Sequence, residues 1–224
     1  MKPIVLSVIV LFAVLFFLRN VFGFFKIMFS AKRPAFRTDQ LFERVKGIFV
    51  YVLGQKRILK NYTWAGIEHF MIFWGFLIIT LGSIEIVVMG YIPGFAIFGF
   101  LGGSAQDMFL LTLDIVQTLV LIALVMGVLN RTVIPSGKRR EVNSIDAVVI
   151  LGMILGLMVS DFGFRASKIA MGLEPSSWLP VSSVWASLFL SDINITTAAF
   201  STEFFYWIHV FLLFAFLNYL PYSK

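Results

Sequence analysis

The sequence predicts an all-α, polytopic membrane protein that forms a single domain over residues 1–224. Of these 224 residues, 59% are hydrophobic and 13% are charged, and the mean hydropathy is +0.93. Soluble domains are less apolar and carry about twice this share of charged residues. Five apolar runs are long enough to cross a bilayer as helices. The sequence holds no cysteine, which excludes cysteine-ligated iron–sulfur clusters, cysteine-ligated zinc and disulfides within it.

The first apolar run, Pro3–Phe22, follows Lys2 and allows two interpretations. A lysine before an apolar stretch is typical of a secretory signal peptide. However, no small-residue cleavage site follows the run, and Arg19 stands where that site would be. We therefore expect an uncleaved first transmembrane helix.

The next segment, Phe25–Thr63, holds nine Lys and Arg residues against only Asp39 and Glu43. Its apolar residues between about 38 and 58 recur at helical spacing, and Thr38 is a suitable N-cap. These features predict an amphipathic helix that lies in the plane of the lipid headgroups. A docking surface for a partner protein is the alternative interpretation.

Four further transmembrane helices are predicted after the basic segment. A loop rich in Gly and Phe, without Lys or Arg, covers residues 90–106. A longer loop precedes the last helix, and its piece Val184–Leu190 is expected to form a short interfacial helix. The predicted spans are Trp64–Met89, Asp107–Asn130, Ile145–Phe164 and Glu203–Leu220.

The distribution of basic residues predicts the orientation of the chain. The first and third loops together carry thirteen of the eighteen Lys and Arg residues, whereas the second loop carries none. Cytoplasmic loops of membrane proteins are enriched in Lys and Arg. We therefore expect these two loops and the C-terminus in the cytoplasm, and the N-terminus outside. The net charge of +6 then reflects membrane topology and not nucleic-acid binding.

Both histidines of the sequence lie inside predicted spans, His69 one turn into the second span and His209 in the fifth. An ionisable residue in a membrane helix is by default a candidate functional residue. Two imidazoles on different helices are typical ligands of haem b in a helical bundle. Gly66, one turn before His69, would let a haem ring approach, and a basic group for the haem propionates precedes it: Lys56, Arg57 and Lys60. The alternative is that each histidine is a hydrogen-bonded structural residue.

Counting residues from the ends of the spans places the two histidines at different depths. At 1.5 Å per residue, His69 lies about 7 Å and His209 about 18 Å below the cytoplasmic edge. The offset of about 11 Å is large for two axial ligands of one iron, although helix tilt absorbs part of it. The sequence therefore leaves open two half-sites, each lacking a ligand, or one strained site.

The stretches GQKRILKNYTWAGIEHFMIFWGF and WIHVFLLFAFLNYLPYSK resemble the membrane cytochrome b domain of the nitrate reductase gamma-subunit type. They are more similar to the version fused to a heterodisulfide-reductase-like, cysteine-rich iron–sulfur protein. That group includes electron-transfer-flavoprotein:menaquinone oxidoreductases. The resemblance spans all five predicted helices. It implies a multi-pass subunit or domain of the prokaryotic inner membrane that passes electrons from a cytoplasmic iron–sulfur or flavoprotein partner to menaquinone.

In that family, histidines early in the second helix and in the fifth helix bind haem b, and they match His69 and His209. Where the nitrate reductase type has a further histidine on the second helix, this sequence has Ile79. The family also has a histidine immediately after the PYSK match, whereas this sequence stops at Lys224. The resemblance thus implies a truncation, a split gene or the membrane part of a longer protein, with one or two haems and an iron–sulfur cluster on a partner or a further domain. A haem-free membrane anchor or a transporter is the alternative.

The outer halves of the predicted spans carry polar side chains that are expensive to place in a membrane. Asp161 and Arg165 stand four residues apart on one helix and are expected to pair. Buried carboxylates and amides can exchange protons with a quinone or bind its carbonyl groups, but structural ion pairs and helix–helix hydrogen bonds are the alternative. The quinone or proton candidates are Glu85, Asp114, Gln117, Asp161 and Arg165.

Overall fold

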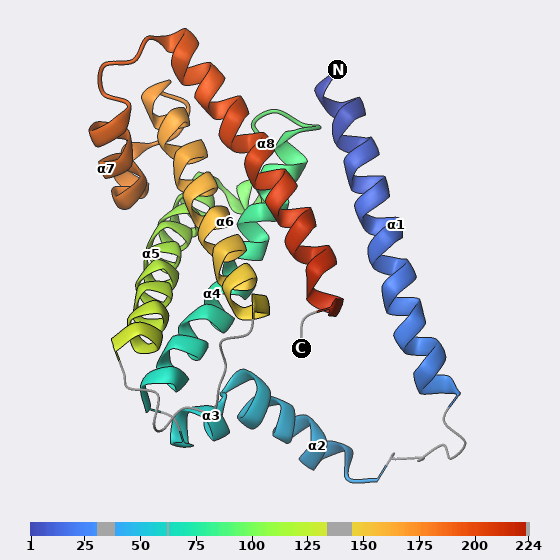
Figure 1. The fold of residues 1–224 in the computed structure, drawn as a ribbon. Helices are drawn as coiled ribbons and strands as arrows, with labels where there is room; N and C mark the ends of the chain where they lie inside the picture. Colours follow the sequence, from blue (N-terminus) through green and yellow to red (C-terminus); the bar gives the residue numbers. More distant parts are fainter. Residues whose placement is uncertain (31–38, 62, 134–144, 223–224) are drawn as a thin grey trace.

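Five long helices cross the molecule, as Figure 1 shows. The computed structural model describes residues 1–30, 39–61, 63–133 and 145–222, and these residues form helices and turns without a strand. Each long helix is apolar enough to span a membrane. The predicted all-α fold class with five spans is therefore confirmed. The five helices are α1 (Lys2–Phe29), α4 (Thr63–Met89), α5 (Gly103–Val133), α6 (Ile145–Ala170) and α8 (Ile195–Tyr219).

Most of these helices are longer than the predicted spans. Helix α8 begins at Ile195, eight residues before the predicted start at Glu203. Its N-cap is Asn194, whose side-chain oxygen accepts a hydrogen bond from the backbone N–H of Thr197 at 2.8 Å. Hydropathy marks only the part of a helix that fits the bilayer, because the backbone hydrogen bonds continue into its more polar ends.

Helices α4, α5, α6 and α8 form the packed core of the bundle. Helix α6 packs most extensively on α8, and α4 on α5. The two helices of the first pair approach closely at Gly156, where an added Cβ would lie 2.8 Å from Leu212 Cδ1. Small residues allow such approaches between membrane helices. The core between these helices is aliphatic and aromatic, with Leu113, Val120 and Met158 almost fully buried.

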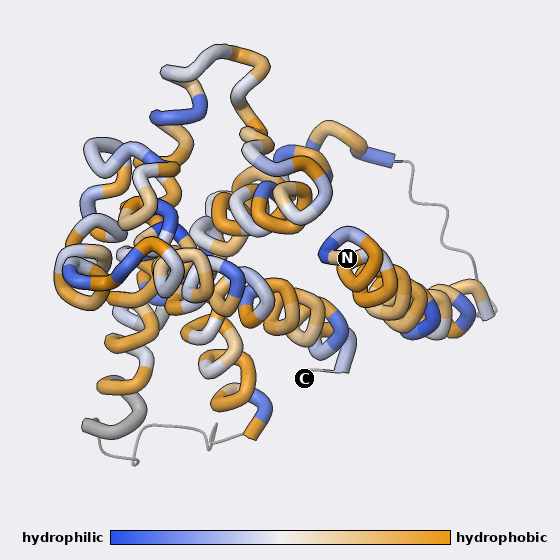
Figure 2. Tube along the Cα trace, turned by 90° about the horizontal axis from the view of Figure 1, so that it is seen from above, coloured by the Kyte–Doolittle hydropathy of each residue, from blue (hydrophilic) through white to orange (hydrophobic). Residues whose placement is uncertain are grey.

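Helix α1 lies at the side of this core, apart from most of the other helices (Figures 1 and 2). Most of its apolar side chains are exposed, and its contacts are chiefly with α8. Near its N-terminus, the Lys2 ammonium lies 2.7 Å from the Glu203 carboxylate. Near its other end, the Tyr222 hydroxyl donates to Asn20 at 2.8 Å. The outward face of α1 is therefore left to lipid.

We call the end of the bundle where α4 begins the basic end, because the short helices that carry the basic segment lie there (Figure 1). These are α2 (Leu41–Gly47), the π-helix η1 (Ile48–Leu53) and α3 (Lys56–Asn61). The predicted continuous amphipathic helix over 38–58 is thus divided into three pieces. The chain turns at Gly54 and Gln55, and Gln55 has a φ of 46°. Thr38, the predicted N-cap, lies outside the described residues. The location of this segment in the plane of the lipid headgroups stays a prediction.

We call the opposite end the α7 end, after the helix α7 (Pro180–Phe189) that lies there (Figure 1). The predicted short helix at Val184–Leu190 is therefore present, but it starts earlier, with proline in the first turn where its missing N–H is harmless. Trp185 of α7 stacks on Phe162 of α6 with ring centroids 5.7 Å apart. Three short 3-10 turns complete the described fold: η2 (Gly99–Leu101), η4 (Ser176–Trp178) and η5 (Leu220–Tyr222).

Candidate functional site

An apolar cavity of about 300 Å³ lies between α4, α5, α6 and α8. One face of α4 forms its longest wall, from His69 at the basic end to Ser83 near the middle of the bundle. Residues of α5, α6, α8 and η5 line the other sides, and almost all of them are aliphatic or aromatic. A largely apolar, pre-formed hollow with a few polar groups is the usual form of a cofactor or small-molecule site.

His69 occupies the basic end of this cavity and is exposed. Its Nδ1 lies 3.0 Å from Oε1 of Gln55, a side chain that is only 3% exposed. An amide oxygen can only accept a hydrogen bond, so Nδ1 is the nitrogen that carries the proton in this arrangement. The other nitrogen, Nε2, then keeps its lone pair. This is the form in which a neutral imidazole binds a metal.

His209 on α8 is fully buried, and both of its ring nitrogens have partners. Nδ1 lies 3.1 Å from the hydroxyl of Ser160 on α6, and Nε2 lies 3.0 Å from the hydroxyl of Ser83 on α4. Ser160 also donates its single hydroxyl hydrogen to the carbonyl of Leu157 at 3.0 Å. Nδ1 is therefore the donor to Ser160, and Nε2 accepts from Ser83. The lone pair of His209 is thus already used by a hydroxyl that lines the cavity.

The structure separates the two histidines along the bundle axis. His209 reaches α4 at Ser83, which is fourteen residues after His69. This corresponds to about 21 Å along the helix, more than the 11 Å expected from counting. The counting had placed Pro221 level with the membrane edge, whereas α8 ends short of α3 (Figure 1). The two imidazoles are therefore not brought to one iron.

The residues of the basic end fit one half of a bis-histidine haem site. His69 offers one unshared nitrogen to the cavity, and no described residue supplies a second imidazole at its level. The described residues also contain no group of three or more His, Cys, Asp or Glu that could hold a metal ion. Three exposed basic side chains lie nearby on α3: Lys56, Arg57 and Lys60.

Gly66 faces α3 and is not part of the cavity wall. A Cβ at this position would lie 2.9 Å from the carbonyl oxygen of Ile58, which is closer than real Cβ atoms come. The absence of a side chain at Gly66 therefore lets α3 pack against the first turns of α4. Its direct effect is on the position of α3.

The five quinone or proton candidates are all fully buried towards the α7 end. The predicted pair is present, since Arg165 Nε lies 3.0 Å from Asp161 Oδ1. The amide of Gln117 donates to the same carboxylate. Arg165 also lies 3.8 Å from Glu174 and interacts with the charges of Glu85 and Asp114. The structure thus joins side chains from three helices into one buried polar group.

Two of these acids hold neighbouring segments in place. Asp114 accepts hydrogen bonds from the backbone N–H groups of Val181 and Ser182 at 2.6 and 3.1 Å, in the first turn of α7. Glu85 accepts from the backbone N–H of Ile97 at 3.0 Å and from the amide of Gln106 at 2.9 Å. Asp114 thus stabilises the positive end of α7, and Glu85 fixes the loop after α4.

Sequence reasoning missed four residues of these sites: Gln55, Ser83, Ser160 and Glu174. Ser83 had a signal, because fourteen residues rotate a helix to within about 40° of the same face, so Ser83 shares the face of His69. Ser160 and Glu174 are ordinary polar residues in sequence, and their partners come from other segments. Gln55 gave no signal, because its importance depends on a turn that folds back on α4.

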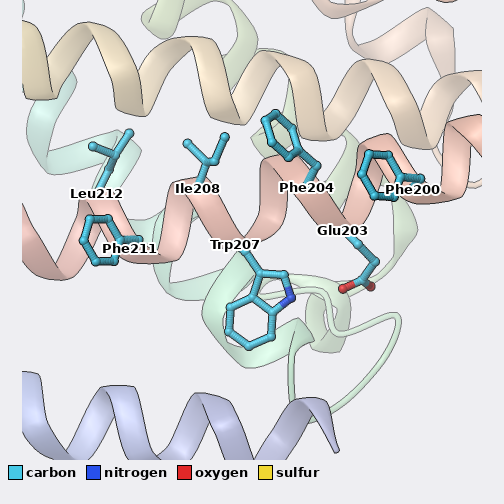
Figure 3. A pocket seen from close by; sticks show the side chains of 7 residues that line it. All are labelled: Phe200, Glu203, Phe204, Trp207, Ile208, Phe211 and Leu212. Carbon is cyan, nitrogen blue, oxygen red and sulfur yellow. The ribbon is translucent and has the colours of Figure 1, made fainter.

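A second hollow, of about 500 Å³, is an open groove on the surface of α8. Figure 3 shows that its lining side chains all project from α8. They are aromatic and aliphatic except for Glu203, and neither histidine is among them. The groove therefore offers an apolar surface without a redox or metal ligand.

Two known proteins are similar to this chain. The probable iron–sulfur-binding oxidoreductase FadF of Bacillus subtilis is 30% identical over 187 residues, which cover 83% of this chain and 26% of that protein. The EtfAB:quinone oxidoreductase of Syntrophomonas wolfei is 25% identical over 217 residues, which cover 91% of this chain and 29% of that protein. No family model and no solved structure matches. The chain spans less than a third of either relative, and the similarity relates it to electron-transfer oxidoreductases.

Proposed function

We propose that this chain is the membrane-embedded, haem b-containing part of a quinone oxidoreductase. Electrons would pass from a cytoplasmic iron–sulfur protein or electron-transfer flavoprotein, through the bundle, to menaquinone in the bilayer of a prokaryotic inner membrane. The names of the two relatives support the iron–sulfur, flavoprotein and quinone parts of this proposal. The resemblance to nitrate-reductase-type cytochrome b domains supports the haem.

The observation that carries the proposal is the apolar cavity with an imidazole nitrogen at its basic end. Bound haem b would supply one-electron transfer. The chain itself would provide Nε2 of His69 as a ligand and an apolar wall that excludes water. It would also provide basic partners for the propionates on α3, the helix whose approach Gly66 permits: Lys56, Arg57 and Lys60.

His209 is the second proposed haem ligand, at the other level of the bundle. Its Nε2 would have to exchange the hydrogen bond from Ser83 for a bond to iron. The distance along α4 supports two half-sites in preference to one shared site. Each half-site would then take its second ligand from outside the described residues.

Quinone chemistry would use the buried polar group at the α7 end. Reduction of a quinone to a quinol takes up two electrons and two protons, so a site for it needs groups that move protons inside the membrane. Buried carboxylates in membrane helices serve such relays. The proposed residues are Glu85, Asp114, Gln117, Asp161 and Arg165.

Optical spectra and haem quantification test the haem part. The purified chain should show a b-type signal in its dithionite-reduced minus oxidised spectrum. His69→Ala and His209→Ala should each remove only part of the haem, because the two residues lie at different levels. Complete loss in both folded variants would support a single shared haem, and a wild-type protein without the signal would overturn haem binding.

The orientation is tested separately with reporter fusions after Lys224. A reporter that is active only in the cytoplasm should work there, because the basic segments should face the cytoplasm. Activity of a periplasmic reporter at the same position would place the basic end outside, and a cytoplasmic electron donor could then not reach it.

One observation favours a haem-free function as a membrane anchor. His209 is fully buried with both nitrogens hydrogen-bonded, as in a purely structural histidine. If this alternative holds, His209→Ala should destabilise the protein while the spectrum of the wild type shows no haem. The same spectral measurement therefore separates the two functions.

A further inference from the structure

A turn at the basic end delivers one buried side chain to His69. Gln55 belongs to the turn of Gly54 and Gln55, between η1 and α3, and its side chain contacts α4. The amide oxygen lies 3.0 Å from His69 Nδ1, and only 3% of the residue is exposed. Glutamine in an interfacial loop normally points to water, so its burial against an imidazole needs an explanation.

The backbone of Gln55 adopts a conformation that glutamine rarely takes. Its φ of 46° lies in the left-handed region, which is unfavourable for residues with a Cβ. Such conformations persist only where the surroundings enforce them, and they concentrate at functional sites. At this position the left-handed backbone goes together with a side chain aimed at His69.

Hydrogen bonds hold the turn at both ends, one from α4 and two from α3. The indole N–H of Trp74 donates to the carbonyl of Leu53 at 3.1 Å. The carbonyl of Gln55 itself accepts from the N–H groups of Ile58 and Leu59, at 3.0 and 3.1 Å, and so starts α3. Gln55 thus occupies the N-cap position of α3, but its side chain bonds the histidine and not the helix.

We infer that Gln55 is a positioning residue that keeps the proton of His69 on Nδ1 and leaves Nε2 as the nitrogen available to a ligand in the cavity. The amide oxygen accepts from Nδ1–H and cannot donate to that nitrogen. The hydrogen bond to one ring nitrogen determines which nitrogen binds a metal and how the ring is oriented. The assignment of the haem as that ligand rests on the proposed function, whereas the position of the proton does not.

Nitrogen NMR of the full chain, purified in detergent and labelled with 15N-histidine, tests the inference. Only two histidines contribute signals, and His209 is an internal reference held by two serines. The wild type should show the His69 proton on Nδ1. Gln55→Leu, which keeps the size of the side chain but has no acceptor, should move much of the proton population to Nε2. Gln55→Glu, which keeps an acceptor at the same reach, should retain the wild-type pattern.

Gln55→Asn is the second variant, and it guards against a misfolded turn. Asparagine tolerates the left-handed backbone better than glutamine does, but its side chain is one methylene shorter. We expect it to fold and still to lose the Nδ1 proton preference. An unchanged His69 signal in both Gln55→Leu and Gln55→Asn would overturn the inference.

Haem binding provides the second measurement. Loss of a hydrogen-bond partner of a ligating histidine typically weakens metal binding by about 10- to 100-fold. We expect such weakening in Gln55→Leu, with recovery in Gln55→Glu. If the wild type itself binds no haem, the proposed function fails while the NMR result still decides the role of Gln55. Equal haem affinity in all variants would restrict Gln55 to setting the proton position.

Discussion

The two histidines of this protein sit in opposite kinds of surroundings. His69 is exposed at the end of an apolar cavity, and among the described residues Gln55 alone hydrogen-bonds it, through one nitrogen. His209 is fully buried between three helices, and Ser83 and Ser160 satisfy both of its nitrogens. A buried polar group with all its hydrogen bonds made contributes to the rigidity of a core, whereas one unshared nitrogen facing a cavity can bind a ligand.

This difference suggests that the α7 end chiefly stabilises the bundle, whereas the basic end is the part suited to bind a ligand. The α7 end contains the ion pair within α6 and the hydrogen bonds that join α4, α5, α6 and α7. The basic end contains the cavity, the exposed imidazole of His69 and short helices. Substitutions at the α7 end should therefore lower the free energy of unfolding, whereas substitutions at the basic end should chiefly change ligand binding.

The largest expected effect is that of Arg165→Leu at the α7 end. Arg165 is fully buried between Asp161 and Glu174, and its removal leaves Asp161 without its cation, whereas Glu174 keeps Lys168 at 2.5 Å. Breaking a buried ion pair typically costs about 3–5 kcal/mol. Chemical unfolding in detergent should show a loss of this size, with part of it recovered in the double variant Arg165→Leu with Asp161→Leu. A loss below about 1 kcal/mol would contradict the structural importance of the pair.

A direct comparison of His209→Ala with His69→Ala should give a smaller but more specific effect. His209→Ala leaves the Ser83 hydroxyl and part of Ser160 unsatisfied in the core, which should lower the free energy of unfolding by about 2 kcal/mol. His69→Ala removes an exposed ring and should change stability by less than about 1 kcal/mol. Equal losses in the two variants would mean that the contrast between the two histidines has no energetic basis.

The smallest expected effect concerns Gly66→Ala, with Gly152→Ala as its control. A Cβ at Gly66 meets the backbone of α3, so this variant should lose about 1 kcal/mol and displace α3. A Cβ at Gly152 on α6 meets nothing within 4 Å, so this variant should gain up to about 1 kcal/mol from helix propensity. Thermal unfolding in detergent gives the signs, and a gain for both variants would argue against close packing of α3 on α4.

The five spans were predictable from the sequence because the membrane imposes a length and a composition on each helix. The pairing of Asp161 with Arg165 was predictable for a similar reason, since both belong to one helix at a fixed spacing. The hydrogen bonds of His209 and Asp114 were not, because their partners are 49 to 126 residues away in the chain. Residue spacing determines which side chains share a face of one helix. Which residues of two helices lie at the same level depends on where each helix begins and ends, and residue spacing does not give this.

The π-helical η1 has a consequence for comparing this chain with its relatives. Its hydrogen bonds join residues five apart, as between Gly54 N–H and the Phe49 carbonyl at 2.8 Å, where an α-helix joins residues four apart. A relative with a plain α-helix at this position should be one residue shorter, and an alignment should place a gap between 48 and 53. Deleting one residue there would rotate the following turn by about 100° and point Gln55 away from His69. The contact between Gln55 and His69 therefore depends on the number of residues in η1 as well as on their identity.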